Sequence, residues 1–135
     1  MTERHFTPEE ANELLGEVRP LAESLVAHRQ AFAAAAARHA HLTGQIAGNG
    51  GDFDLAETRA GAEKLEREAE AVAEAVESLQ RLGVLVKDLD RGLVDFPALR
   101  GGDEVLLCWQ VGEDEVAFWH GVDEGFAGRK PLPLD

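Results

Sequence analysis

The stretch that decides the fold is "SLQRLGVLVKDLDRGLVDF", Ser78–Phe96, because the spacing of its hydrophobic residues changes partway along. Before Gly83 the apolar residues recur every three or four positions, which is typical of one face of a helix. After Gly83, "VLVKDL" and "LVDF" have the composition of strands, and "DRG" between them suits a hairpin turn with Gly92 in the left-handed conformation. The sequence therefore predicts an α+β protein in which helices precede a sheet.

The first helix is expected to begin at "FTPEEANELL". Thr7 suits the N-cap, Pro8 the first helical position, and Glu10 completes a capping box three residues after the threonine. Apolar residues then follow at alternating steps of four and three, as in a coiled-coil seam. Pro20 lies inside this seam, and its ring clashes with the carbonyl four residues earlier, so a kink is expected near it.

A second helix is expected after the turn "GNGG", residues 48–51, with Asp54 as its N-cap and Gly83 as its end. The two helices then form a long antiparallel hairpin over residues 8–82. His28 and His39 occupy seam positions where leucine is expected. Each either bonds a nearby glutamate or water, or contributes to a metal or proton site between helices.

The segment "AFAAAAARHAH", residues 31–41, places small side chains on every face of the first helix. Small side chains let another helix approach closely, so a hairpin from a second copy can complete a four-helix bundle. A homodimer is therefore expected. The alternative is that the alanines only favour helix formation in a solvated segment.

After the hairpin, residues 84–122 are expected to form a four-stranded antiparallel β-meander, and residues 123–135 an irregular tail rich in glycine and proline. The whole chain, residues 1–135, then forms a single domain. Both faces of the last two strands are largely apolar. One face is expected under the helices, and the other under the tail or a second subunit.

The register of the last two strands decides which side chains meet. A turn centred on Glu113 and Asp114 pairs Leu107 with His120 and Cys108 with Trp119. This register places Cys108 and His120 on opposite faces of the sheet. Cys108 is then expected to be a small buried hydrophobic residue.

The net charge of −13 disfavours binding to nucleic acids and to anionic membranes. One cysteine excludes an internal disulfide, and the charged N-terminal stretch does not resemble a signal peptide. A cytoplasmic protein is therefore expected, and the excess of arginine over lysine suggests a bacterial source. The chain has no phosphate-binding loop, Gly-x-Gly-x-x-Gly or Gly-x-Ser-x-Gly motif, so nucleotide chemistry and serine hydrolysis are not expected.

His120 is the main candidate for a functional side chain. It follows Trp119 at a strand end, with Asp95, Glu113 and Asp123 expected nearby. A histidine with carboxylates suits a divalent cation, whereas a four-ligand structural zinc site is excluded by the single cysteine. The alternative is that His120 caps the edge of the sheet through Asp123 or a backbone carbonyl.

Most of the chain resembles an uncharacterised bacterial family, number 2203 among the domains of unknown function. The resemblance is carried by "FTPEEANELL" and by the motifs "KDxDxGLVDFP", "LCWxxGE", "WH" and "GFxGR". It implies no activity. It implies a signature made of Lys87, Asp88, Gly92, Asp95, Cys108, Trp109, Glu113, Trp119, His120, Gly125 and Arg129.

Besides a purely structural adaptor that uses the alanine-rich face of the first helix, two functions follow as hypotheses. The first is a non-enzymatic binding or assembly protein whose pocket, at the end of the sheet, holds a small polar molecule or a divalent metal. The pocket residues would be Asp95, Glu113, Trp119, His120 and Arg129. Arg129 can instead pair with Asp95 or Glu113 and anchor the tail. The second is an enzyme in which His120 is a general base or metal ligand, with Glu113 or Asp95 as its carboxylate partner.

Overall fold

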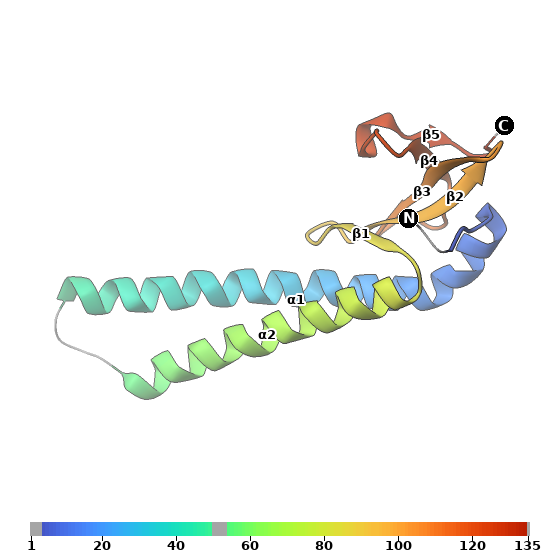
Figure 1. The fold of residues 1–135 in the computed structure, drawn as a ribbon. Helices are drawn as coiled ribbons and strands as arrows, with labels where there is room; N and C mark the ends of the chain where they lie inside the picture. The colour runs from blue at the N-terminus through green and yellow to red at the C-terminus, as the bar shows by residue number, and fades with distance from the viewer. Residues whose placement is uncertain (1–3, 50–53, 135) are drawn as a thin grey trace.

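The structure is a computed structural model and describes residues 4–49 and 54–134. Two long helices, α1 (Pro8–Asn49) and α2 (Leu55–Arg81), lie side by side and are followed by a small sheet (Figure 1). The strands are β1 (Leu85–Asp88), β2 (Leu93–Arg100), β3 (Asp103–Gln110), β4 (Phe118–Gly121) and β5 (Lys130–Pro131). A 3₁₀ helix, η1 (Phe126–Gly128), precedes β5. The predicted α+β class is confirmed, and the tail adds a short fifth strand to the four predicted.

The predicted N-terminal caps are present in both helices. The backbone N–H of Glu10 donates to the Thr7 hydroxyl at 3.1 Å, and the Glu10 carboxylate accepts from the Thr7 N–H at 2.9 Å. Asp54 accepts from the N–H of Glu57 at 3.1 Å. Part of the "GNGG" turn lies outside the described residues. Over the described residues, neither helix combines the length and the hydropathy needed to cross a bilayer.

Helix α1 continues through Pro20 without a break. Figure 1 shows its first turns bent away from the axis of the rest of the helix and toward the sheet, as the proline predicts. The bent segment and the residues just before it bury Phe6, Ala11, Leu15 and Val18 in the core. The bend therefore lets α1 pack against the sheet with its first turns and against α2 with the rest of its length.

The sheet has the order β1-β2-β3-β4-β5, and all neighbouring strands are antiparallel. Its first face packs on the helices through Val94, Phe96, Ala98, Val105, Leu107 and Trp109. Side chains alternate along each strand, so the opposite face carries Leu93, Asp95, Leu106, Cys108 and His120. These five are also buried, and the tail, with Val122 and Phe126, lies over them.

The predicted register of β3 and β4 is wrong by one residue. Leu106 pairs with His120, Leu107 with Trp119 and Cys108 with Phe118. Because a shift of one residue turns every side chain of a strand to the other face, Cys108 and His120 lie on the same face. The tight turn expected at Glu113 and Asp114 is replaced by a longer loop, residues 111–117.

This loop differs from the prediction because helix α1 holds it. Asn12 accepts from the N–H of Val116 at 2.7 Å and donates to its carbonyl at 3.2 Å, so Val116 cannot pair with β3. Arg19 donates to the carbonyls of Glu113 and Asp114 at 3.1 and 2.7 Å. Pairing with β3 therefore resumes only at Phe118.

The far part of the hairpin has an open groove between α1 and α2. Alanines of α1, with Gly61 of α2, line much of it. His28 bonds Glu68 at 3.2 Å, as one alternative predicted, whereas His39 Nδ1 is buried with no hydrogen-bond partner among the described residues. A homodimer through this part of the hairpin stays a prediction.

Gly92 ends the first β-turn with a φ of +63°, as predicted. A Cβ atom added there would lie 2.5 Å from Val111 and 2.8 Å from Val26, and both valines are stiff. Gly92→Ala is therefore expected to lower the free energy of unfolding by about 2–4 kcal/mol, measured by urea denaturation. Gly101→Ala is the matched control, because Gly101 has a φ of +58° with no atom near its Cβ. Equal losses in the two variants would contradict the steric argument.

Candidate metal-binding site

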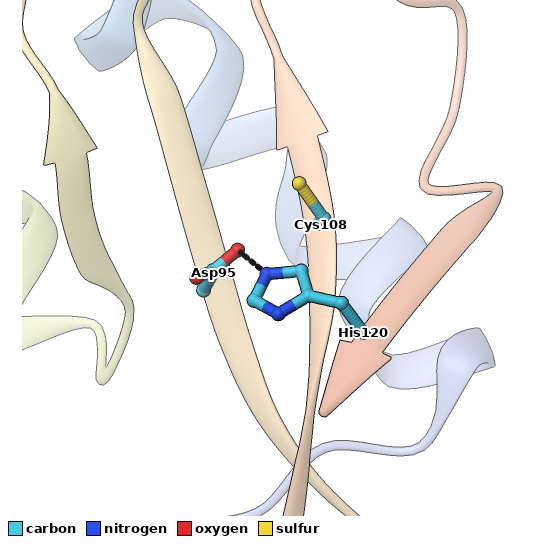
Figure 2. Close-up of side chains that lie close together, drawn as sticks. All are labelled: Asp95, Cys108 and His120. Atoms are coloured by element: carbon cyan, nitrogen blue, oxygen red, sulfur yellow. Dashed lines mark hydrogen bonds and ion pairs between the residues drawn. The ribbon is translucent and has the colours of Figure 1, made fainter. Parts of the chain in front are cut away.

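Three buried side chains meet on the sheet face that the tail covers: Asp95 from β2, Cys108 from β3 and His120 from β4 (Figure 2). Asp95 lies directly across from Cys108 in the β2–β3 register. His120 lies across from Leu106, two residues before Cys108, so it is a diagonal neighbour of the thiol. One potential ligand atom from each residue lies within 4.8 Å of the other two.

Both ring nitrogens of His120 are engaged. Nδ1 lies 2.8 Å from the Gly121 carbonyl, and Nε2 lies 3.1 Å from the Asp95 carboxylate. Since a carbonyl oxygen only accepts, Nδ1 carries a proton and donates it. The ring is thus fixed in orientation, and both of its nitrogens already have hydrogen-bond partners.

Cys108 is fully buried, and its thiol is protonated at neutral pH. Burial raises its pKa to about 11, and the negative charge of Asp95 adds to the rise, although Arg129 opposes it. A nucleophilic cysteine needs a lowered pKa and a free imidazole nitrogen beside the sulfur. Cys108 has neither in this arrangement, so covalent thiol catalysis is not supported.

The three donors fit a transition metal such as Zn²⁺. Zinc binds thiolate sulfur, imidazole nitrogen and carboxylate oxygen, and sites with three protein ligands leave a fourth position for water or substrate. A histidine that binds a metal through one ring nitrogen is usually oriented by a hydrogen bond from the other. The bond from His120 Nδ1–H to the Gly121 carbonyl has this role, and Nε2 is then the nitrogen that faces the metal. Tetrahedral ligand atoms lie roughly 3.3–3.8 Å apart, so separations of up to 4.8 Å close with small side-chain rotations.

A cavity of about 250 Å³ opens beside this cluster. Asp95 and His120 lie in its wall, so a fourth ligand can reach a metal held between them. The other lining residues are Lys87, Leu93, Leu106, Val122, Glu124, Gly125 and Phe126.

Glu124, on the tail side of the cavity, is held in place by two donors. Lys130 Nζ donates to its carboxylate at 2.7 Å and the N–H of Gly121 at 2.8 Å. The Lys130 bond first, and then the Gly121 bond, lower the pKa of Glu124, so the carboxylate is ionised and paired. A Cβ added at Gly128 would lie 2.8 Å from Glu124 Cβ, which shows how closely the tail folds around this residue.

Two residues that the sequence placed in the pocket form a separate ion pair. Both terminal nitrogens of Arg129 donate to the Glu113 carboxylate, at 2.9 and 2.6 Å, and one also donates to the Cys108 carbonyl at 3.1 Å. Burial alone would lower the pKa of Arg129, but its bonds to Glu113 outweigh that effect and raise it. The guanidinium also lies against the rings of Phe118 and Phe126. Arg129 therefore anchors the tail to the sheet, as one alternative predicted.

Trp119 and Asp123 also lie apart from the cluster. Trp119 pairs with Leu107 on the face toward the helices, where it packs against the core. Asp123 is exposed, and within residues 54–134 it makes no hydrogen bond or ion pair with His120. Of the residues predicted for the site, the structure thus brings Asp95 and His120 together.

Sequence reasoning missed three residues of this region. The predicted register places Cys108 on the face opposite His120, and it does not identify Lys87 and Glu124 as lining residues. The one available signal for Cys108 was its position thirteen residues after Asp95, which a β2–β3 hairpin around "RGGD" makes directly opposite. No local pattern indicated that the tail would fold back over this face.

A family model described as "Uncharacterized conserved protein (DUF2203)" matches residues 4–132. No curated protein and no solved structure matches the chain. The matched span takes in both helices, all five strands and the three clustered side chains. The chain therefore belongs to the DUF2203 family of uncharacterized conserved proteins.

Proposed function

We propose that this protein binds one divalent transition metal through Asp95, Cys108 and His120. The observation that carries the proposal is the meeting of these three buried side chains, with ligand atoms within 4.8 Å of one another, beside a cavity that Asp95 and His120 line. A lone buried cysteine, or a histidine paired with an aspartate, has ordinary structural explanations. The three together form a donor set that packing alone does not require.

Zinc suits this donor set better than calcium or magnesium does. Calcium and magnesium prefer six or more oxygen ligands, and here a single carboxylate is accompanied by sulfur and nitrogen. Burial of the cluster also disfavours a hydrated magnesium ion. The protein would supply a carboxylate, a thiolate and a neutral imidazole, and the cavity would supply the space for a fourth ligand.

The second candidate function is that of a metal-dependent enzyme, and the cavity favours it because a substrate could reach the metal there. A metal with one open position can activate a bound water or polarise a substrate carbonyl. In this version His120 acts as a metal ligand with Asp95 as its carboxylate partner. The version with His120 as a general base is weaker, because both ring nitrogens are engaged and Glu113 is bound to Arg129. Residence in the bacterial cytoplasm stays a prediction in either case.

Cobalt spectroscopy tests the proposal directly. Tag-free protein, stripped of metal with a chelator, is titrated with Co²⁺. One equivalent is expected to produce a thiolate-to-cobalt charge-transfer band in the near ultraviolet and the visible bands of a four-coordinate ion, and Zn²⁺ should remove both. Cys108→Ser should abolish the charge-transfer band, and His120→Ala should abolish stoichiometric uptake.

The matched controls are Asp123→Asn, an exposed carboxylate outside the cluster, and His28→Ala, a histidine of the hairpin. Both should keep the full spectrum. Circular dichroism of each variant checks that the fold is intact. A wild-type protein that takes up no cobalt, or a charge-transfer band that survives Cys108→Ser, would overturn the proposal.

A further inference from the structure

Among the residues that the structure describes, the cavity beside the proposed metal site has one cationic side chain without a partner. Glu124 is paired with Lys130 at 2.7 Å, and Asp95 is bonded to His120 at 3.1 Å. Lys87 also lines the cavity, but it makes no hydrogen bond or ion pair with any residue in the described ranges. Its ammonium is therefore available to a ligand.

The charge of the loaded site leaves this cation uncompensated. A divalent metal bound by the Cys108 thiolate, the Asp95 carboxylate and a neutral His120 has a net charge of zero. Lys87 then gives the cavity a single positive charge, and two of the metal's ligands, Asp95 and His120, lie in the wall of the same cavity. A negatively charged oxygen ligand can both pair with the Lys87 ammonium and fill the open coordination position of the metal.

The remaining walls of the cavity are largely apolar. They come from Leu93, Leu106, Val122 and Phe126. The volume of about 250 Å³ lies below the ~300–1,000 Å³ of typical sites for drug-sized molecules. The ligand is therefore small, with one anionic end and a short hydrocarbon part.

We infer that the site binds a small aliphatic monocarboxylate. One carboxylate oxygen would take the open position on the metal, the other would accept from Lys87 Nζ, and the alkyl chain would lie against Phe126 and the two leucines. Inorganic phosphate fits less well, because it carries more charge than one lysine balances and has nothing to bury against the apolar walls. This inference rests on the proposed metal site.

Butyrate is the probe, and the cobalt-loaded protein is the form to use. Butyrate is expected to shift the visible cobalt bands in a saturable way. Lys87→Met should weaken butyrate binding about tenfold while the cobalt spectrum before butyrate is added stays that of the wild type. Lys64→Met is the matched control, because Lys64 lies in the distant groove of the hairpin, and it should bind butyrate like the wild type.

The outcomes separate this inference from the metal site itself. Failure of the protein to take up cobalt would defeat the proposed function before butyrate is tested. Normal cobalt uptake with no response to butyrate would defeat only the carboxylate inference. Butyramide binding as tightly as butyrate would show that the cavity recognises the chain and not the charge. Phosphate binding more tightly than butyrate would also overturn the choice of a carboxylate.

Discussion

Replacement of Trp109 by alanine is expected to lower the free energy of unfolding by about 3–5 kcal/mol. The indole is fully buried where the sheet meets the helices, and it is among the largest side chains of the core. Its Nε1 donates to the Glu113 carbonyl at 3.0 Å, and the Arg19 guanidinium lies 5.5 Å from its ring. The variant would lose the buried apolar area of the indole and leave a cavity. It would also lose the hydrogen bond from Trp109 to loop 111–117.

Urea denaturation followed by circular dichroism measures this loss. Trp119→Ala is the control, because Trp119 lies on the same face of the sheet but is only partly buried, under Arg100 and Lys130. Its loss should be clearly smaller, about 1–2 kcal/mol, since less apolar surface is removed from contact. Equal losses for the two tryptophans would mean that burial in the sheet core does not explain the stability.

The affinity for Zn²⁺ is expected to fall about tenfold for each unit by which the pH drops from 8 to 6, because the thiol proton of Cys108 must leave when the metal binds. Burial raises the pKa of this thiol to about 11, so the thiol is protonated throughout this range. Protons therefore compete with the metal for the thiolate, and the affinity for Zn²⁺ rises with pH up to the pKa of the thiol.

Two measurements check this expectation. Competition with a chromophoric chelator gives the affinity at each pH, and calorimetry in buffers of different ionisation enthalpy counts the protons released. His28→Ala should not change either result, since His28 lies in the hairpin and bonds Glu68. An affinity independent of pH, or binding without proton release, would show that the metal is held by other groups.

Local signals in the sequence were sufficient to predict the elements of the fold. The capping box at Thr7 and Glu10, the cap at Asp54 and the left-handed Gly92 all depend on residues within a few positions of one another. The bend in α1 likewise follows from Pro20 alone. Such features can be read from sequence because the atoms that determine them are close along the chain.

The site depended on interactions that no local pattern contains. Asn12 and Arg19 hold loop 111–117 from about one hundred residues away, and this hold sets where β4 begins. Asp95 and His120 were predicted because their chemistry stands out in an apolar sheet. Cys108 was not, because its place beside His120 depends on a register that the helix determines.

Strand β4 has an alternative pairing with β3, shifted by one residue, that competes with the native one during folding. If β4 slid to the pairing that its own sequence suggests, Trp119 would turn to the tail side and His120 would enter the hydrophobic core. The slipped sheet would retain most of its hydrogen bonds but could not assemble the three ligands. A metal ion bound by Asp95, Cys108 and His120 would therefore stabilise the native pairing and not the slipped one. Metal binding would thus favour one of two closely similar sheets.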